Sequence, residues 1–183
     1  MKYISNPVKI GNLILGGGAP IVVQTMCNTH TSDVEASFCQ CVELAEAGAQ
    51  MIRLTVPSLA QVNSIAEIRS RLRSKGIDVP IVADVHFSSE IAIAAAAVVD
   101  KVRINPGNFH RDHNKAREQF SKLVAVCKEH GTALRVGVNH GSLGERITEL
   151  YGNTSFAMKE AAMEWLRNNG FSADKIIIDI LVF

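Results

Sequence analysis

Short apolar runs alternate with helix-like segments along this chain, and that alternation constrains the fold more than any other feature. Six runs have the length and β-branched composition of strands, namely residues 21–25, 51–56, 81–85, 101–105, 133–138 and 175–180. The segments between them begin at capping residues and stop at glycines, which predicts helices over residues 32–48, 59–75, 90–99, 112–130 and 154–168, with a shorter helix near 143–150. Strands and helices in this order predict a parallel sheet built from βαβ units. A short hairpin over residues 8–15, turning at Gly11-Asn12, precedes them.

Two architectures have this alternation, an open doubly wound sheet and a closed (β/α)8 barrel. Length favours the open sheet, because a complete barrel takes about 250 residues and only about six units fit into 183 residues. The strand faces favour the barrel. Strands covered by helices on both sides should be apolar throughout, whereas residues 51–56 place Ile52 and Leu54 on one face and Arg53 and Thr55 on the other. We therefore expect a TIM (β/α)8-type barrel truncated to about six units, forming one domain over residues 1–183.

Three arginines lie on the polar faces of these strands, Arg53, Arg103 and Arg135. Asp84 is the clearest acid that could pair with them, and Asp179 is a possible second. A purely structural arginine–aspartate network inside the barrel is one interpretation. The surplus of positive charge favours the other, an anionic ligand held by several guanidinium groups, of which phosphate or diphosphate fits best.

Other polar residues gather where the strands end, the place where barrel enzymes carry their active sites. They are Gln24, Asn28, His86, Asn105, Asn139 and Ser142. Gly141 and Ser142 can also bring backbone N–H groups close to an anion. Lys101 and Pro80 stand at the opposite ends of their strands and are not part of the predicted site.

Metal and thiol chemistry find less support. Five of the six histidines lie in loops, but no H-x-H or H-E-x-x-H spacing occurs and carboxylates are few, so we predict no protein-bound metal. Cys27, near His30, could be a nucleophile, although packing at a strand end is the favoured interpretation. The four cysteines, at positions 27, 39, 41 and 127, form no C-x-x-C pair, which indicates reduced thiols in a cytoplasmic protein.

Charge and composition exclude several classes of partner. A net charge of +1 and 5% aromatic residues give no footprint for nucleic acid. No stretch approaches the roughly 20 apolar residues of a membrane span, and the first residues carry no export signal. We expect no nucleic-acid or membrane partner.

The strand ends resemble those of the 4-hydroxy-3-methylbut-2-enyl diphosphate synthases, iron–sulfur enzymes of the non-mevalonate route to isoprenoids (terpenoids). The resemblance is carried by Val23-Gln24-Thr25-Met26 with Asn28-Thr29, Ile52-Arg53-Leu54-Thr55-Val56-Pro57, Val82-Ala83-Asp84-Val85-His86-Phe87, Val102-Arg103-Ile104-Asn105-Pro106-Gly107-Asn108, and Arg135-Val136-Gly137-Val138-Asn139-His140-Gly141-Ser142-Leu143. These motifs cover nearly the whole chain.

The resemblance implies a barrel that binds 2-C-methyl-D-erythritol 2,4-cyclodiphosphate by its diphosphate. Arg53, Arg103, Arg135 and Asn139 match the residues with that role, and Asp84, His86 and Asn105 match residues at the mouth. The implied reaction is a two-electron reductive ring opening with loss of water. Ferredoxin or flavodoxin supplies the electrons through a 4Fe-4S cluster, whose ligands the family carries on a separate C-terminal domain, and the family forms homodimers.

The sequence departs from the family pattern at three points. No C-terminal cluster domain is present, Leu181 stands where the family has a diphosphate-contacting lysine, and Cys27 replaces a small hydroxyl residue. We therefore expect an inactive partial barrel that is marginally stable or pairs its open edges with a second copy. Two alternatives remain open at this point: a synthase barrel that binds a pterin diphosphate, and a non-catalytic phosphate-binding domain.

Overall fold

The computed structural model of the chain describes residues 5–168 and 176–180. Within these ranges six strands form one parallel sheet in the order in which they occur along the chain. They are β3 (Gln24–Met26), β4 (Met51–Thr55), β5 (Ile81–Asp84), β6 (Lys101–Ile104), β7 (Ala133–Val138) and β8 (Ile176–Ile180). Consecutive parallel strands require a crossover between them, which is the arrangement of a TIM barrel. The predicted alternation of strands and helices is confirmed.

Helices make these crossovers, and most begin at a capping side chain. They are α1 (Val34–Glu46), α2 (Leu59–Ser74), α3 (Ser89–Ala96), α4 (His113–His130), α5 (Glu145–Tyr151) and α6 (Ser155–Asn168). The helix predicted from residue 32 is capped one residue later, by Asp33, whose carboxylate accepts from the N–H of Ala36 at 3.0 Å. Asp112 caps α4 as predicted, and Gly131 ends it with a φ of 69°, which glycine adopts without strain. None of the helices in the described ranges is both long and apolar enough to cross a membrane.

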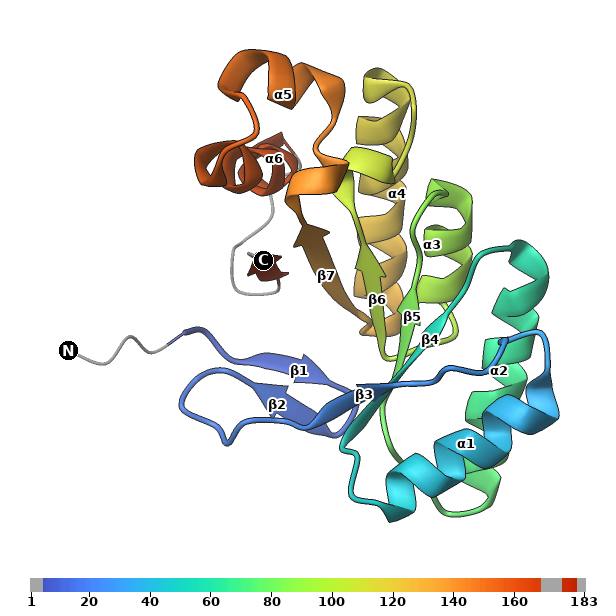
Figure 1. Cartoon of the computed structure of the whole chain (residues 1–183). Coiled ribbons are helices and arrows are strands. Elements are labelled where there is room, and N and C mark those ends of the chain that lie inside the picture. The colour runs from blue at the N-terminus through green and yellow to red at the C-terminus, as the bar shows by residue number, and fades with distance from the viewer. Residues whose placement is uncertain (1–4, 169–175, 181–183) are drawn as a thin grey trace.

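The main core lies between the sheet and these helices. Ile52 and Leu54 of β4 and Val102 and Ile104 of β6 are at most 1% exposed, and they belong to one cluster with residues of the helices. Figure 1 shows α1 to α4 along one side of the strands. The apolar positions of the strand alternation therefore face the helices, which leaves the polar positions for the other side of the sheet.

The predicted hairpin is present as β1 (Val8–Ile10) and β2 (Leu13–Leu15), and it lies on that other side (Figure 1). Val8 and Ile10 are buried in a second cluster with Met51, Val82 and Ala133. Met51 and Ala133 are the first residues of their strands, and Val82 is the second of its strand. The hairpin therefore covers the amino-terminal ends of the strands and leaves their carboxyl ends uncovered.

Some sequence expectations differ from the structure or lie outside it. The first predicted strand, residues 21–25, is observed only as Gln24–Met26. The predicted last strand began at Lys175, which lies outside the described residues, as does Leu181. Asp179 lies opposite Gly137 in the β7–β8 register, but its side chain is outside the described part.

Candidate functional site

Asp84, at the carboxyl end of β5, joins three of the predicted site residues. Its carboxylate is 1% exposed and accepts a hydrogen bond from Nη2 of Arg53 at 2.6 Å. The same carboxylate accepts from Nη1 of Arg103 at 3.4 Å and lies 2.9 Å from Nε2 of His86. A buried carboxylate is stable only when its charge is answered in this way. The strand alternation thus brings Arg53, Asp84, His86 and Arg103 together.

The His86 ring lies between the Asp84 carboxylate and the Arg103 guanidinium. Nε2 faces Asp84, and Nδ1 lies 3.4 Å from Nη1 of Arg103. Because a guanidinium can only donate, both bonds form together when Nε2 carries the proton and Nδ1 accepts. The side chain of His86 is 37% exposed, so it lies where the buried charges meet the open end of the sheet.

Arg135 adds a third guanidinium, since it lies opposite Arg103 in the β6–β7 register. Burial lowers the pKa of Arg103 and of Arg135, and the positive charge of Arg53 lowers both further, while Asp84 opposes the shift. Nε of Arg53 is buried without a hydrogen-bond partner among the described atoms. Three guanidiniums and one carboxylate leave a surplus of positive charge among the described side chains on this face. Such a surplus suits an anion.

A second group of polar side chains joins the ends of β6 and β7. Asn105 donates to Oγ of Ser142 at 2.5 Å, and that hydroxyl donates to Oδ1 of Asn139 at 2.6 Å. The N–H of Gly107 donates to Oδ1 of Asn105 at 3.0 Å. Here the turns η1 (Pro106–Asn108) and η2 (His140–Ser142) pack so closely that a Cβ on Gly107 would lie 1.7 Å from the carbonyl oxygen of Ser142. Asn105, Asn139 and Ser142 are therefore fixed together.

Two predicted site residues lie apart from these groups. Gln24 is the first residue of β3, and its Oε1 accepts a hydrogen bond from Nζ of Lys101 at 3.0 Å. Asn28 follows β3, and its Oδ1 accepts from Nε2 of Gln40 on α1 at 2.6 Å. Gln24 therefore lies nearer the amino-terminal ends of the strands than the three arginines do. The side-chain amide of Asn28 is bound to α1.

Sequence reasoning missed two residues of this interior. Lys101 is 2% exposed and lies inside the sheet, on the same face of β6 as Arg103. Its place two residues before Arg103 was the signal that could have found it. Gly137 makes room for Arg103, because a Cβ there would lie 2.7 Å from Nε of Arg103. Nothing in the sequence alone indicates that contact.

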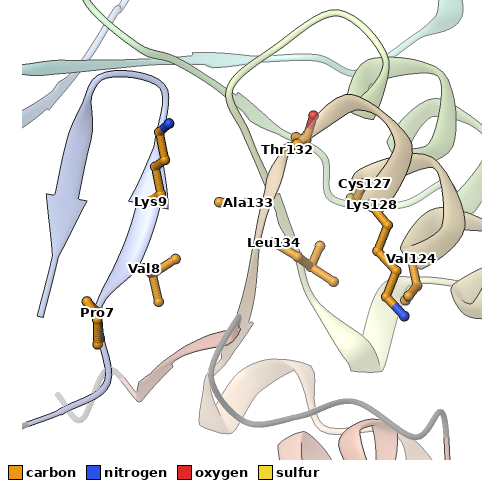
Figure 2. Close-up of a pocket in the computed structure, with 10 residues that line it drawn as sticks. Pro7, Val8, Lys9, Val124, Cys127, Lys128, Thr132, Ala133 and Leu134 are labelled. Atoms are coloured by element: carbon orange, nitrogen blue, oxygen red, sulfur yellow. The ribbon is translucent and has the colours of Figure 1, made fainter. Parts of the chain in front are cut away.

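Cavities occur at both ends of the strands. A pocket of ≈ 110 Å³ is lined by Thr55, Asp84 and His86 at the carboxyl ends of β4 and β5. A pocket of ≈ 350 Å³ lies at the other end, between the hairpin and β7 with α4. Figure 2 shows Val8 and Lys9 on one side of it and Ala133 and Leu134 on the other. The larger pocket is thus separate from the arginine cluster.

The described cysteines and histidines do not form a metal site. No group of three or more His, Cys, Asp or Glu side chains that could hold a metal occurs among the described residues. Cys27 and Cys41 are buried with their sulfur atoms 3.6 Å apart, and the hydrogen bond from Cys41 lowers the pKa of Cys27. Cys39 is exposed and contacts Glu35, and burial raises the pKa of Cys127 to about 12. The described donors do not fit a 4Fe-4S cluster, which takes cysteine thiolates around one centre.

The sequence of the chain is similar to that of a family of diphosphate synthases. Residues 5–180 match the family model described as the GcpE TIM-barrel domain. The chain is 43% identical over 176 residues to the 4-hydroxy-3-methylbut-2-en-1-yl diphosphate synthase (flavodoxin) of Leptospira interrogans, with 87% of this chain and 26% of the relative covered. It is 42% identical over 184 residues to the 4-hydroxy-3-methylbut-2-en-1-yl diphosphate synthase (ferredoxin) of Synechococcus sp. strain CC9605, with 91% and 46% covered. The chain thus spans between a quarter and a half of the length of these relatives.

Two solved structures share the architecture. Dihydropteroate synthase from Burkholderia cenocepacia, in complex with 7,8-dihydropteroate, superposes with a TM-score of 0.63 at 16% identity, covering 97% of this chain and 64% of that one. A truncated 3-deoxy-D-arabino-heptulosonate 7-phosphate synthase from Thermotoga maritima gives 0.63 at 15% identity, covering 98% and 59%. At these identities the likeness supports the barrel fold and carries no argument about pterin chemistry.

Proposed function

The chain belongs to the GcpE TIM-barrel family, and from that membership we propose that it is the substrate-binding barrel of a 4-hydroxy-3-methylbut-2-enyl diphosphate synthase. The proposed substrate is 2-C-methyl-D-erythritol 2,4-cyclodiphosphate, and the reaction of the whole enzyme is its two-electron reductive ring opening with loss of water. The observation that carries the proposal is that three guanidinium groups lie around the one buried carboxylate, Asp84, that is described on this face of the sheet. A diphosphate adds negative charge beside them, and its oxygens match the forked donors of arginine.

The strand register supports the binding roles that we assign. Arg103 and Arg135 lie side by side on β6 and β7, and Arg53 reaches Asp84 from β4. We assign these three arginines to the diphosphate. Asn105, Asn139 and Ser142 form the neighbouring polar wall and present amide and hydroxyl groups to the rest of the substrate. Gln24 and Asn28 act, on this assignment, through Lys101 and α1 rather than by contact.

Asp84 and His86 are the residues we assign to catalysis. Asp84 fixes the proton of His86 on Nε2, so the imidazole keeps a lone pair on Nδ1 that Arg103 engages at 3.4 Å. An anion that draws Arg103 toward itself releases this lone pair. His86 can then accept or return a proton at the mouth of the barrel, as loss of water requires.

The electrons come from outside the described residues. The relatives are named for flavodoxin and ferredoxin, and we propose one of these as the donor, with a 4Fe-4S cluster as the intermediate carrier. Because the described donors do not fit that cluster, we assign no electron-transfer step to them. Binding and orienting the cyclodiphosphate, in a homodimer, is the part of the reaction proposed for this chain.

Titration calorimetry with the cyclodiphosphate and with inorganic diphosphate tests this proposal. Arg103→Ala should weaken binding by a few kcal/mol, as expected when one partner of a desolvated charge pair is removed. The matched control is Arg71→Ala, since Arg71 pairs with the exposed Glu35 on the outer surface. Undiminished affinity in Arg103→Ala, or tighter binding of a pterin diphosphate than of the cyclodiphosphate, contradicts the proposal.

A further inference from the structure

Lys101 is a buried cation to which the proposed function assigns no contact with the substrate. Its Nζ donates to Oε1 of Gln24 at 3.0 Å and lies 3.1 Å from Sδ of Met51. No carboxylate among the described side chains pairs with it. A buried ammonium without a counter-ion costs several kcal/mol, so its presence calls for a reason.

The surroundings of Lys101 keep it dry. Val82 and Ala133 flank it in the sheet register. Both belong to the apolar cluster that Val8 and Ile10 of the hairpin cover. Lys101 is therefore sealed from water below, and the guanidinium groups lie above it. A charge in such a layer acts on its neighbours through a low effective dielectric.

The charged groups that face Lys101 are nearly all positive. They are Arg53 from β4, Arg103 from its own strand and Arg135 from β7, with Asp84 of β5 as the one described acid. Gln24 of β3 is uncharged, the buried hairpin residues Val8 and Ile10 are apolar, and the hairpin cation Lys9 is exposed. Burial, followed by repulsion from Arg135 and Arg53, lowers the pKa of Lys101 to about 8. The protonation of Lys101 thus depends on Arg53 and Arg135, two of the arginines that the proposed function assigns to the diphosphate.

We propose that Lys101 is a positioning residue for the anion, a buried positive charge that holds its proton while the arginines are occupied and releases it at alkaline pH when they are empty. The inference rests on the proposed function. An anion at Arg53 and Arg135 offsets their repulsion of Lys101 and so raises its proton affinity. By linkage, protonated Lys101 raises the affinity for the anion by the same factor.

The sign of the pH dependence follows. Below the pKa of about 8, Lys101 is charged in both the free and the bound chain and strengthens binding fully. Above it, the free chain loses the proton and must regain it on binding, so the advantage declines as pH rises. Between the pKa of Lys101 in the free chain and its higher pKa in the bound chain, binding takes up a proton.

The test uses inorganic diphosphate as the probe and Lys101→Met as the variant. Methionine keeps much of the length and suits the apolar layer, so the fold should persist. Near pH 7 the variant should bind roughly tenfold more weakly, the effect expected of one buried charge acting through a low effective dielectric. Near pH 10 the two affinities should converge. Calorimetry in two buffers of different ionisation enthalpy should show more proton uptake in the wild type than in the variant near pH 8.5.

Two further variants separate the charge from a structural role. Lys122→Met removes an exposed lysine of α4 that pairs with Glu118, and it should change neither affinity nor proton uptake. Gln24→Glu places a carboxylate beside Nζ, so it should move the midpoint of the pH transition upward. A merely structural lysine would leave that midpoint unmoved.

The outcomes distinguish this inference from the proposed function. If the wild type binds no diphosphate, both are overturned. If it binds diphosphate, and Arg103→Ala weakens binding while Lys101→Met leaves the affinity and the proton uptake unchanged at every pH, only the role of Lys101 is overturned. A constant ratio of the two affinities from pH 7 to 10 also overturns it.

Discussion

Gly137 shows at the scale of one residue how a missing side chain shapes this site. The side chain of Arg103 lies over Gly137 of β7, where a Cβ would be 2.7 Å from Nε and 3.0 Å from Nη2 of the guanidinium. The methyl group of an alanine at position 137 would fit only if the side chain of Arg103 moved. Since the side chain of Arg103 is 11% exposed, any new position has to be found within the same crowded interior.

Gly137→Ala should therefore weaken diphosphate binding about tenfold, the loss expected when one charged hydrogen-bonding group is displaced, with a much smaller effect on the melting temperature. The obstacle is a side chain rather than backbone, so the fold can adjust. Gly144→Ala is the matched control, because a Cβ there meets nothing within 4 Å. Calorimetry together with thermal melts measures both effects, and unchanged affinity in Gly137→Ala would show that Arg103 does not need this space.

The residue scale also shows how far sequence reasoning reaches into the site. Strand alternation fixes the face of a side chain, so it correctly placed Arg53, Asp84 and Arg103 together. It equally places Lys101 on that face, although at the end of the strand opposite to the predicted site. A loop residue such as Asn28 has no alternation to orient it, and only the structure reveals its bond to Gln40. Contacts between a side chain and a glycine are likewise invisible in one sequence.

At the scale of elements, an ion pair on the helix side of the sheet ties α2 to two strands. The carboxylate of Asp100, next to β6, accepts from Nε and Nη2 of Arg69 at 3.2 and 2.6 Å. It also accepts from the N–H of Ile81, the first residue of β5, at 2.9 Å. The side chain of Asp100 is 6% exposed. One buried acid therefore fixes the start of two strands against one helix.

Asp100→Ala should lower the free energy of unfolding by about 3 kcal/mol, because it leaves a partly buried guanidinium and a buried N–H without their partner. Glu35→Ala is the comparison, since it breaks the exposed pair with Arg71, and a solvent-screened pair contributes far less to stability than a buried one. Urea unfolding followed by circular dichroism measures both. Equal losses in the two variants would show that burial does not set the strength of these pairs.

Element boundaries were predictable where a local signal defines them. Asp112 and Gly131 mark the two ends of α4 in the sequence and in the structure. The first strand was predicted over 21–25 but is observed over Gln24–Met26. Among the described strands it pairs only with β4, whose residues Met51 to Arg53 set the length of the ladder. An apolar run predicts a strand, whereas the neighbour decides how much of it is paired.

For the whole molecule, the polar faces of the strands predicted the barrel correctly, although chain length favoured an open sheet. Burial explains why the faces are informative: an arginine among the strand residues that pack against the helices would lie in the hydrophobic core, so Arg53, Arg103 and Arg135 indicate a common interior on the other face. Nothing in the alternation shows how the edges of the sheet are covered. Among the described strands, β3 and β8 each pair with one neighbour. Which strands lie at the edges depends on the assembled sheet and cannot be predicted from the pattern of a single strand.

The β3 edge carries exposed apolar side chains, and self-association is the behaviour expected of it. Ile21 is 94% exposed and Val23 is 57% exposed, and both precede β3, which pairs on one side only within the described sheet. Such an edge pairs with another chain unless it is charged or covered. The weight-average sedimentation coefficient of the chain should therefore rise with concentration between roughly 1 μM and 1 mM.

Ile21→Lys should suppress this rise with little effect on the stability of the monomer, since the side chain of Ile21 is almost fully exposed. Leu59→Lys replaces a 52% exposed residue at the start of α2 and should leave the rise intact. A concentration-independent monomer in the wild type, or equal suppression by both lysines, would show that the β3 edge does not drive association.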